Sequence, residues 1–234
     1  MNLQQLQTEL QSISNKNNAQ ILQRFFKTGP GQYGEGDLFR GIKVPQLRKL
    51  VAQYFTISLE NTTRLLHSPY HEDRLCALLI LVKKMKTSDE NCRSSIFKLY
   101  MSNSSYVNNW DLVDLSAEHI PGSYLLDKPK TPLYQFAKSK LLWERRIALL
   151  STFHYIKKNQ FEDTLAISKL LLTDKEDLIH KAIGWMLREI GKRNSQIEIE
   201  FITTNYSNLP RTTLRYAIER FPEEQRKKFL KGIF

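Results

Sequence analysis

Residues 74–81 of the chain are RLCALLIL, and residues 146–153 are the similar run RIALLSTF. Between them Trp110 begins WDLVDLSAEHI, and farther on Lys181 begins KAIGWML, so the four runs start 36, 36 and 35 residues apart. One more step of about 35 residues reaches Arg215 in LRYAIERF. A recurrence of this length, carried by pairs of helices, is typical of an α-solenoid. The spacing therefore predicts an all-α fold in which stacked helix pairs form an α–α superhelix.

The spacing of apolar residues in the rest of the chain is also helical, and no stretch shows the alternation of a convincing strand. Each helix pair buries its apolar face only against its neighbours, so we expect one continuous domain over residues 1–234 with a concave face for an extended partner. The expected helices cover residues 2–13, 18–27, 45–55, 58–67, 71–86, 90–101, 109–120, 132–139, 141–158, 161–172, 176–192, 195–205, 211–220 and 223–231.

One segment interrupts this helical pattern. Residues 29–45 (GPGQYGEGDLFRGIKVP) contain five of the nine glycines and two of the eight prolines. We expect a long, ordered connection there. Pro45 should lie in the first turn of the following helix, where a missing N–H is tolerated.

Composition limits the class of protein. Hydrophobic residues make up 41% of the chain, which favours a globular protein over a disordered one. No apolar run reaches the roughly 18 residues that span a bilayer. The N-terminus is polar and lacks the features of a signal peptide, so we expect a cytoplasmic protein. The two cysteines, Cys76 and Cys92, form no CxxC pair, and we expect reduced thiols rather than a metal or redox site.

The net charge of +11 indicates a polyanionic partner, with nucleic acid first and an anionic membrane surface second. A solvated basic surface without such a partner is the alternative that charge alone leaves open. The cations are dense in the C-terminal third of the chain: Lys181, Arg188, Lys192, Arg193, Arg211, Arg215, Arg220, Arg226, Lys227, Lys228 and Lys231.

The helix that begins at Trp110 has an unusual polar face. With about 100° between successive residues, its apolar residues gather on one side. Trp110 lies on the other side with three carboxylates, those of Asp111, Asp114 and Glu118. Either Trp110 packs on a neighbouring repeat, with Asp111 favoured by the positive helix N-terminus, or this face lines a binding site.

Two later helices also break the pattern. Trp185 lies away from the apolar stripe of its helix and is flanked by Lys181 and Arg188. It either packs between helices beneath basic side chains or forms an aromatic wall in a basic groove. Arg146 instead falls within an apolar stripe, where a guanidinium needs an anion. That anion is either a carboxylate of the preceding repeat or a DNA phosphate.

These unusual positions lie about one repeat apart, and equivalent positions of a solenoid stack side by side. Trp110 with Asp114, Arg146 and Trp185 can therefore line one cleft. Two aromatic side chains, a carboxylate and a cation would suit a cationic or planar group.

Four stretches resemble the DNA alkylation repair family of AlkD-type glycosylases. They are GPGQYGEGDLFRGIKVPQLRKL, NNWDLVDLSAEHIPGSYL, WERRIALLSTFHYIKK and IHKAIGWMLREIGKRN, at residues 29–50, 108–125, 143–158 and 179–194. The resemblance covers nearly the whole chain. It implies HEAT-like repeats around a concave, basic face that binds double-stranded DNA. It also implies hydrolysis of the N-glycosidic bond of N3- and N7-alkylated purines in base excision repair, without metal or cofactor.

The resemblance also implies roles for individual residues. Asp114 matches the catalytic aspartate, Trp110 and Trp185 match the two cleft tryptophans, and Arg146 matches the cleft arginine. Phe25 matches an N-terminal cleft aromatic residue that the family also supplies as Tyr.

Three further residues are expected to contact DNA. Lys181 and Arg188 lie on the helix of Trp185, and His154 stands at a basic contact position after the arginine helix. The chain departs from the family just before KAIGW, where Asp177 and Leu178 replace positions that can be aromatic.

The resulting hypothesis is a monofunctional glycosylase that acts as a monomer on alkylated duplex DNA, with no membrane partner and no metal. The second hypothesis is a non-catalytic HEAT-like module that binds DNA structures or a protein partner. The third is an RNA-binding scaffold, which predicts more exposed aromatic residues for unstacked bases. The carboxylate of Asp114 favours the enzyme.

Overall fold

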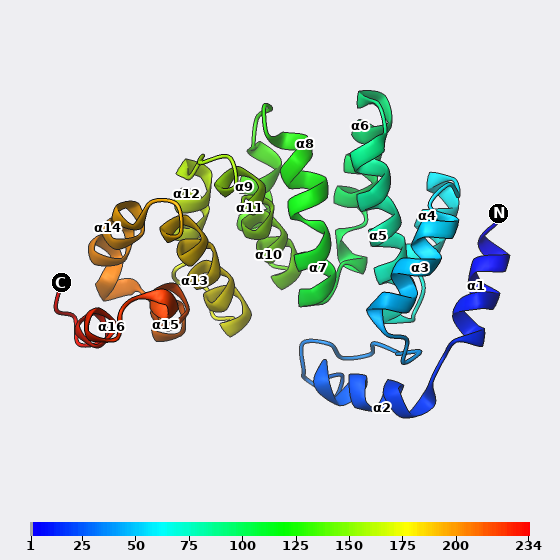
Figure 1. The fold of residues 1–234 in the computed structure, drawn as a ribbon, viewed down its shortest axis with the longest axis horizontal. Coiled ribbons are helices and arrows are strands. Elements are labelled where there is room, and N and C mark those ends of the chain that lie inside the picture. The colour runs from blue at the N-terminus through cyan, green and yellow to red at the C-terminus, as the bar shows by residue number, and fades with distance from the viewer. Residues whose placement is uncertain (1) are drawn as a thin grey trace. The chain divides into compact units, whose positions relative to one another are not determined.

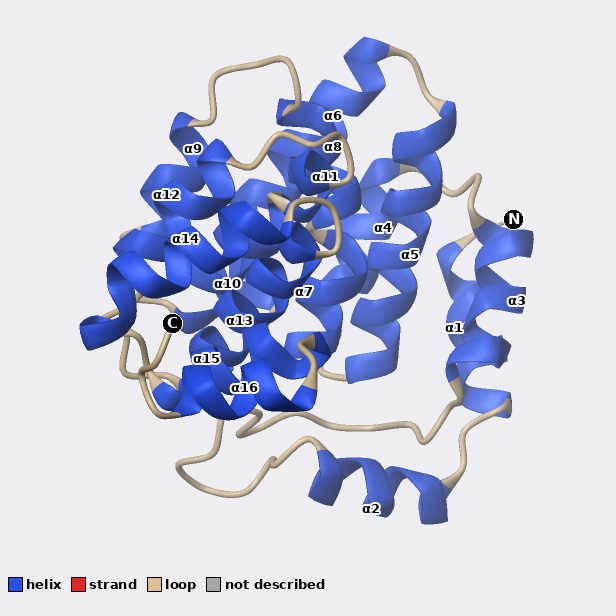
Figure 2. Ribbon diagram, turned by 60° about the vertical axis from the view of Figure 1, so that its left-hand side comes forward, coloured by secondary structure: helices blue, strands red, loops and turns tan. Residues whose placement is uncertain are grey.

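The computed structural model describes residues 2–234, and they form the predicted all-α fold (Figures 1 and 2). Within these residues the only pairing of β type is an isolated bridge between Leu38 and Tyr70. The same residues contain no helix with the length and apolar character needed to cross a membrane. The chain divides into two compact units, Met1–Ile120 and Pro121–Phe234.

The N-terminal unit contains α1 (Leu3–Ser12), α2 (Lys16–Phe25), α3 (Val44–Tyr54), α4 (Leu59–Leu66), α5 (His71–Thr87), α6 (Glu90–Ser102), a 3₁₀ turn at Ser104–Tyr106 and α7 (Trp110–Ser116). The C-terminal unit contains α8 (Ser123–Leu125), α9 (Thr131–Ala137), α10 (Leu142–Ser151), α11 (Phe153–Ile156), α12 (Glu162–Leu170), α13 (Asp177–Gly191), α14 (Ser195–Asn205), a 3₁₀ turn at Tyr206–Asn208, α15 (Arg211–Ala217), a 3₁₀ turn at Ile218–Arg220 and α16 (Glu223–Leu230).

The repeated runs of the sequence occupy successive packed helices within each unit. In the N-terminal unit α5 packs against α3, α4 and α6, and its next repeat partner is α7. In the C-terminal unit α10 packs against α13, and α13 packs against α15 (Figure 1). The sequence period near 35 residues is therefore the distance along the chain from one helix of this series to the next, as expected for helix-pair repeats.

The apolar stripe predicted for KAIGWML forms the core of the C-terminal unit. Its members are at most 1% exposed: Ile179, Ala182, Ile183, Met186, Leu187 and Ile190. Burial of each large side chain of this kind contributes about 1.5–3 kcal/mol to stability. Gly184 allows α15 to approach α13, since a Cβ atom there would lie 2.4 Å from the Cβ of Tyr216 and 2.5 Å from the carbonyl oxygen of Thr213.

Two expected helices end earlier than predicted. The helix expected over residues 109–120 ends at Ser116 and is followed by a π-helical turn, Glu118–Gly122, and the short α8. Pro121 lies inside this turn and cannot donate a helical hydrogen bond. The helix expected over 141–158 breaks at Thr152 between α10 and α11. There the hydroxyl groups of Ser151 and Thr152 donate to the carbonyls of Ile147 and Leu149, a pattern that bends helices.

The long connection between α2 and α3 is ordered, as predicted. The backbone N–H of Leu38 donates to the carbonyl of Pro69, and that of His71 donates to the carbonyl of Leu38, which ties the connection to the start of α5. Gly41 has a positive φ of 79°, and a Cβ atom there would lie 2.1 Å from the carbonyl oxygen of Asn15. Pro45 lies in the first turn of α3, also as predicted.

Candidate active site

Trp110 and Asp114 begin the candidate site on α7. Residues four apart share a helix face, and both side chains are half-buried, whereas Leu112 and Val113 on the other side are fully buried. The side chain of Asn109 caps the helix by accepting from the backbone N–H of Trp110 at 2.9 Å. The local fold therefore keeps the tryptophan and the carboxylate out of the core. Glu118, expected on the same face, is instead buried at 8% exposure, at the start of the π-helical turn.

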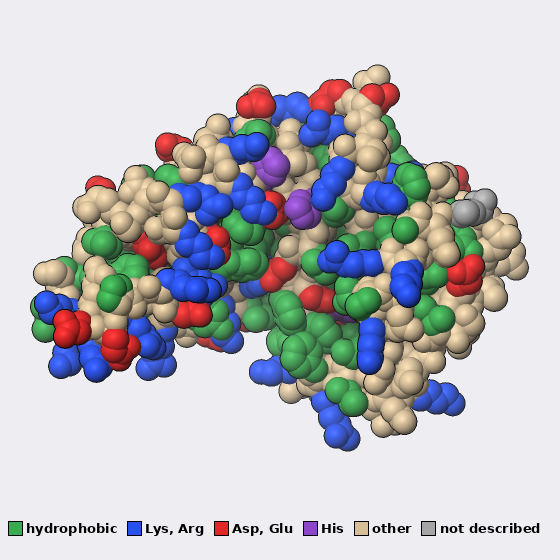
Figure 3. Space-filling model, viewed as in Figure 1, with side chains coloured by type: hydrophobic (Ala, Val, Ile, Leu, Met, Phe, Trp, Pro, Cys, Tyr) green, Lys and Arg blue, Asp and Glu red, His purple; other side chains and the backbone are tan. Residues whose placement is uncertain are grey.

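The ring of Trp110 belongs to an aromatic cluster at the end of α2. It stacks on Phe26 with centroids 5.4 Å apart and meets the edge of Phe25 at 6.1 Å. Phe25 is 61% exposed, which is unusual for a phenylalanine in a packed cluster. Figure 3 shows hydrophobic side chains gathered at this end of α2. Two of the predicted site residues, Phe25 and Trp110, thus lie together within the N-terminal unit.

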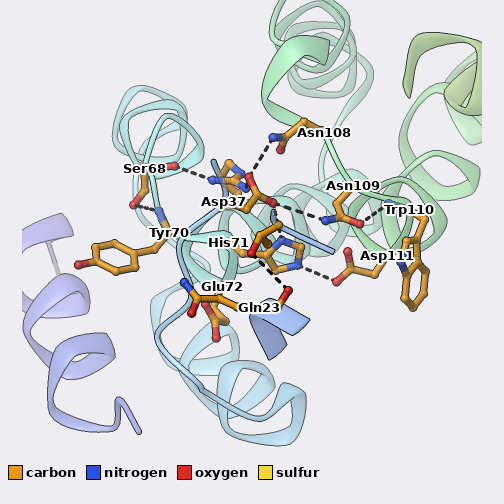
Figure 4. A network of polar contacts seen from close by, with 12 residues as sticks. Gln23, Asp37, Ser68, Tyr70, His71, Glu72, Asn108, Asn109, Trp110 and Asp111 are labelled. Carbon is orange, nitrogen blue, oxygen red and sulfur yellow. Dashed lines mark hydrogen bonds and ion pairs between the residues drawn. The ribbon is translucent and has the colours of Figure 1, made fainter. Parts of the chain in front are cut away.

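Beneath this cluster the chain holds a buried network of charged groups (Figure 4). The Nε2 atom of His71 lies 2.8 Å from Oδ2 of Asp111, and its Nδ1 atom lies 3.4 Å from Oδ2 of Asp37. The guanidinium of Arg74 donates to the other oxygen of Asp37 at 2.7 Å. The ring of Phe39 stacks on His71 with centroids 4.7 Å apart, and the ring of Phe26 lies tilted against it at 4.9 Å. The network therefore joins the long connection, α5 and the first turn of α7.

Burial and pairing act against each other on these groups. Burial, the largest influence on His71, lowers its pKa, but hydrogen bonds to Asp111 and Asp37 outweigh it and the pKa is raised. Burial would raise the pKa of Asp37, yet the hydrogen bond from His71 and the charge of Arg74 hold that pKa below its usual value. Both shifts favour the charged forms.

Neighbouring charges of α5 hold the backbone of the connection. The carboxylate of Glu72 accepts from the backbone N–H groups of Arg40, Gly41 and Ile42 at 2.7–3.1 Å. The guanidinium of Arg40 pairs with both oxygens of Asp73 at 2.6 and 2.9 Å. Such charge-assisted bonds are stronger than neutral ones. The loop that carries Asp37 and Phe39 is therefore fixed from several points.

The sequence pattern did not predict this network. His71, Glu72, Asp73 and Arg74 are at most 4% exposed, although all four are ionisable. Their run, HEDR, leads directly into the apolar run LCALLIL, and four ionisable residues at the start of a buried helix must find partners. Asp37, Arg40 and backbone N–H groups of the glycine-rich connection supply most of those partners, and Asp111 of α7 supplies another.

An apolar cavity of about 430 Å³ lies in the N-terminal unit between α2, the connection and α5. Phe25, Phe26 and Phe39 line it together with aliphatic side chains of α2 and α3 and with His71 and Asp111. It borders the Trp110 cluster through the same phenylalanine rings.

In the C-terminal unit, Trp185 is half-buried on α13, away from the core stripe as predicted. Its indole Nε1 donates to Oε1 of Glu189 at 3.3 Å, and its ring lies 5.7 Å from that of Phe153. Glu189 also binds Lys192 at 2.5 Å. Trp185 is thus oriented mainly by residues of its own helix.

Arg146 is 5% exposed, so the predicted buried guanidinium is confirmed. Its Nη1 atom donates to the backbone carbonyl of Leu178 in the first turn of α13 at 2.5 Å. This contact links α10 to the helix of Trp185. An ion pair between this guanidinium and either a carboxylate or a DNA phosphate stays a prediction.

The other predicted DNA contacts also lie in this unit. Lys181 pairs with Asp177 at 2.8 Å on the exposed side of α13, and Arg188 forms an ion pair with Glu219. His154 is half-buried on α11. Figure 3 shows further Lys and Arg side chains over α15 and α16. Among residues 2–234, no group of three or more His, Cys, Asp or Glu side chains is arranged to hold a metal ion.

Comparison with known proteins places these residues in a family. No curated protein matches the chain significantly. A solved structure titled "Predicted DNA alkylation repair enzyme from Enterococcus faecalis" is similar in fold, with a TM-score of 0.69 and 20% identity over 90% of this chain and 97% of that chain. The family model described as DNA alkylation repair enzyme matches residues 6–221. Because this match spans almost the whole chain, the protein belongs to the family of DNA alkylation repair enzymes.

Proposed function

We propose that the protein is a monofunctional DNA glycosylase that hydrolyses the N-glycosidic bond of N3- and N7-alkylated purines in duplex DNA. A purine alkylated at either nitrogen carries a positive charge, so its glycosidic bond is already weakened and the departing base needs no proton. The site can therefore work without a general acid. It needs a group that stabilises the positive charge left on the deoxyribose.

Asp114 suits that task. Departure of the base builds oxocarbenium charge on the sugar, and a carboxylate facing it stabilises the transition state more than the ground state. The same carboxylate can orient the attacking water. Asp114 is half-buried on the face of α7 that it shares with Trp110, so it is not consumed by the core. This placement, in a chain of the alkylation repair family, is the observation that carries the proposal.

The aromatic and basic residues would hold the DNA. The faces of Trp110 and Trp185 favour a developing cation, and Phe25 extends the aromatic surface beside Trp110. Arg146 would bind a phosphate near the lesion, since a guanidinium fits phosphate geometry. Lys181, Arg188 and His154 would add contacts to the backbone. In this proposal residues 1–234 act as one monomeric domain.

The decisive experiment measures base release. Duplex DNA is treated with a methylating agent and incubated with the protein, and free 3-methyladenine and 7-methylguanine are separated by chromatography. We expect release well above the spontaneous rate, and none of unmodified adenine or guanine. DNA binding without any release would instead support the non-catalytic module.

A further inference from the structure

His71 stands between two carboxylates that can only accept hydrogen bonds. Its Nε2 atom faces Oδ2 of Asp111 at 2.8 Å, and its Nδ1 atom faces Oδ2 of Asp37 at 3.4 Å. A neutral imidazole carries one N–H and would turn a lone pair toward one of these oxygens. The arrangement therefore calls for an imidazolium that donates at both ends.

The surroundings of His71 balance this charge. Asp37 reaches it from the connection and Asp111 from α7, while Arg74 of its own helix α5 pairs with Asp37. The uncharged rings of Phe26 and Phe39 also lie against His71, with centroids 4.9 and 4.7 Å away. Two anions thus face two cations. Loss of the His71 proton would leave an uncompensated negative charge at a site that is 2% exposed, which is costly in a low-dielectric interior.

The network acts on the first turn of α7. Asp111 directly follows Trp110, and its second oxygen, Oδ1, is buried without a hydrogen-bond partner, so the contact with His71 is what holds this carboxylate. Phe26 provides a second connection to this turn, because its ring stacks on Trp110 and lies tilted against His71. Both sets of contacts connect the buried helix α5 to the first turn of α7, which carries Trp110 and leads to Asp114.

We propose that His71, as an imidazolium held between Asp37 and Asp111, is a positioning residue that sets the first turn of α7 and with it the placement of Trp110 and Asp114 for base excision. This inference rests on the proposed glycosylase function. His71 itself is too deeply buried to meet the substrate. Deprotonation releases the turn, so excision declines as the pH rises through the pKa of His71.

The test compares the pH profile of excision with the ionisation of one side chain. Single-turnover release of 7-methylguanine is measured across pH, and the ring of His71 is titrated by NMR on the same protein. We expect the pH profile of excision and the titration of the His71 ring to have the same midpoint. Asp111→Asn removes a facing anion, so both midpoints should move to lower pH, by about tenfold or more in proton concentration. His71→Gln should lower excision at low pH and abolish the midpoint. His67→Gln is the matched control, because His67 is exposed and bonds only outside the network, to Asn103.

A purely structural role for His71 predicts a different result, namely a loss of excision that is equal at every pH and follows the melting temperature. Identical pH profiles for wild type and Asp111→Asn would overturn the proposal. A second readout separates it from the proposed function. In protein labelled with 5-fluorotryptophan, the ¹⁹F signal of Trp110 should titrate with His71 in the wild type and not in His71→Gln. If no base is released at any pH, the glycosylase proposal is wrong. Independently of that outcome, a Trp110 signal that does not change with the ionisation of His71 would contradict the positioning role.

Discussion

The two candidate tryptophans are held in different ways. Trp110 rests on Phe25 and Phe26, and a buried charge network fixes the turn that follows it. Trp185 bonds to Glu189, one helical turn later on α13, and meets one neighbouring ring. The first environment is assembled from segments far apart in the sequence, and the second is mostly local. Under the proposed function, this difference predicts exact placement of the reacting group by the N-terminal unit and more adaptable DNA contact by the C-terminal unit.

The largest effect expected from this comparison concerns Asp114. Asp114→Asn keeps the size of the side chain and removes its charge, so excision should slow about 10²-fold or more, on the order of 3 kcal/mol in the barrier. Affinity for duplex DNA should stay the same or rise slightly, because a negative charge is lost. The measurements are single-turnover base release, duplex affinity and melting temperature.

Glu60→Gln is the matched control for this change. It makes the same replacement of carboxylate by amide on an exposed side chain of the same unit, where Glu60 pairs with Arg64. Asp111→Asn is unsuitable as a control, since Asp111 binds the buried His71. A stable Asp114→Asn protein that excises at the wild-type rate would refute the proposed mechanism.

Replacing each tryptophan by alanine compares the two environments directly. Both rings are half-buried. Each change should therefore cost less stability than the roughly 3–5 kcal/mol of a fully buried ring. We expect excision to fall about tenfold in each variant, equivalent to about 1.4 kcal/mol, with the larger loss for Trp110→Ala because more rings contact it. Stability is measured by chemical denaturation, and excision is measured as the rate of base release.

The third tryptophan supplies the control. Trp143 is also half-buried but is not among the candidate site residues, so Trp143→Ala should lower stability without a matching loss of excision. If Trp110→Ala and Trp185→Ala both lose stability on the scale of core residues, the two rings are structural and the site hypothesis is wrong.

Buried carboxylates sharpen the same contrast. Asp37 in the N-terminal unit has partners and a lowered pKa, whereas burial raises the pKa of Glu198 on α14 to about 8, with only a smaller opposing effect from Arg188. The Oε1 atom of Glu198 is buried without a hydrogen-bond partner, and its carboxyl packs against Gly191. A raised pKa means that the folded protein binds the proton more tightly than the unfolded chain does.

The free energy of unfolding should therefore fall as the pH rises from the unfolded pKa near 4.5 to the folded pKa near 8. We expect a fall of about 1–2 kcal/mol from this group, since a tenfold change in proton affinity corresponds to about 1.4 kcal/mol and relaxation of the structure reduces the effect. Glu198→Gln should remove that part of the pH dependence, as measured by urea unfolding at acidic and at mildly alkaline pH, on either side of this range. An equally steep fall in the variant would assign it to other groups.

Much of the fold was predictable because it is periodic. The repeated apolar runs predict α5, α7, α10, α13 and α15, and the clustered glycines predict the long connection. The periodicity of apolar residues also predicts that Trp185 lies outside the core stripe of α13. It carries no information on which charge meets which, so the contacts of His71 with Asp37 and Asp111, across 34 and 40 residues, could not be derived from it. The helix end at Ser116 and the break at Thr152 were likewise not predicted, because they depend on a proline and on hydroxyl contacts.

The smallest expected effect concerns Lys181, four residues before Trp185 on α13. Its ion pair with Asp177 is exposed and local, and such a pair is worth only about 0.3–0.5 kcal/mol, so Lys181 can exchange it for a phosphate at little cost. Lys181→Ala should weaken duplex binding a few-fold and reduce the slope of log affinity against log salt by about one. Lys86→Ala is the control, because this substitution removes the same charge. Lys86 is exposed and lies at the end of α5 farthest from His71. If both variants keep the wild-type slope, α13 does not bind the DNA backbone through Lys181. If both variants lower the salt slope equally, DNA binding depends on overall charge rather than on Lys181. In that case α13 offers no specific electrostatic contact to set against the precisely held N-terminal site.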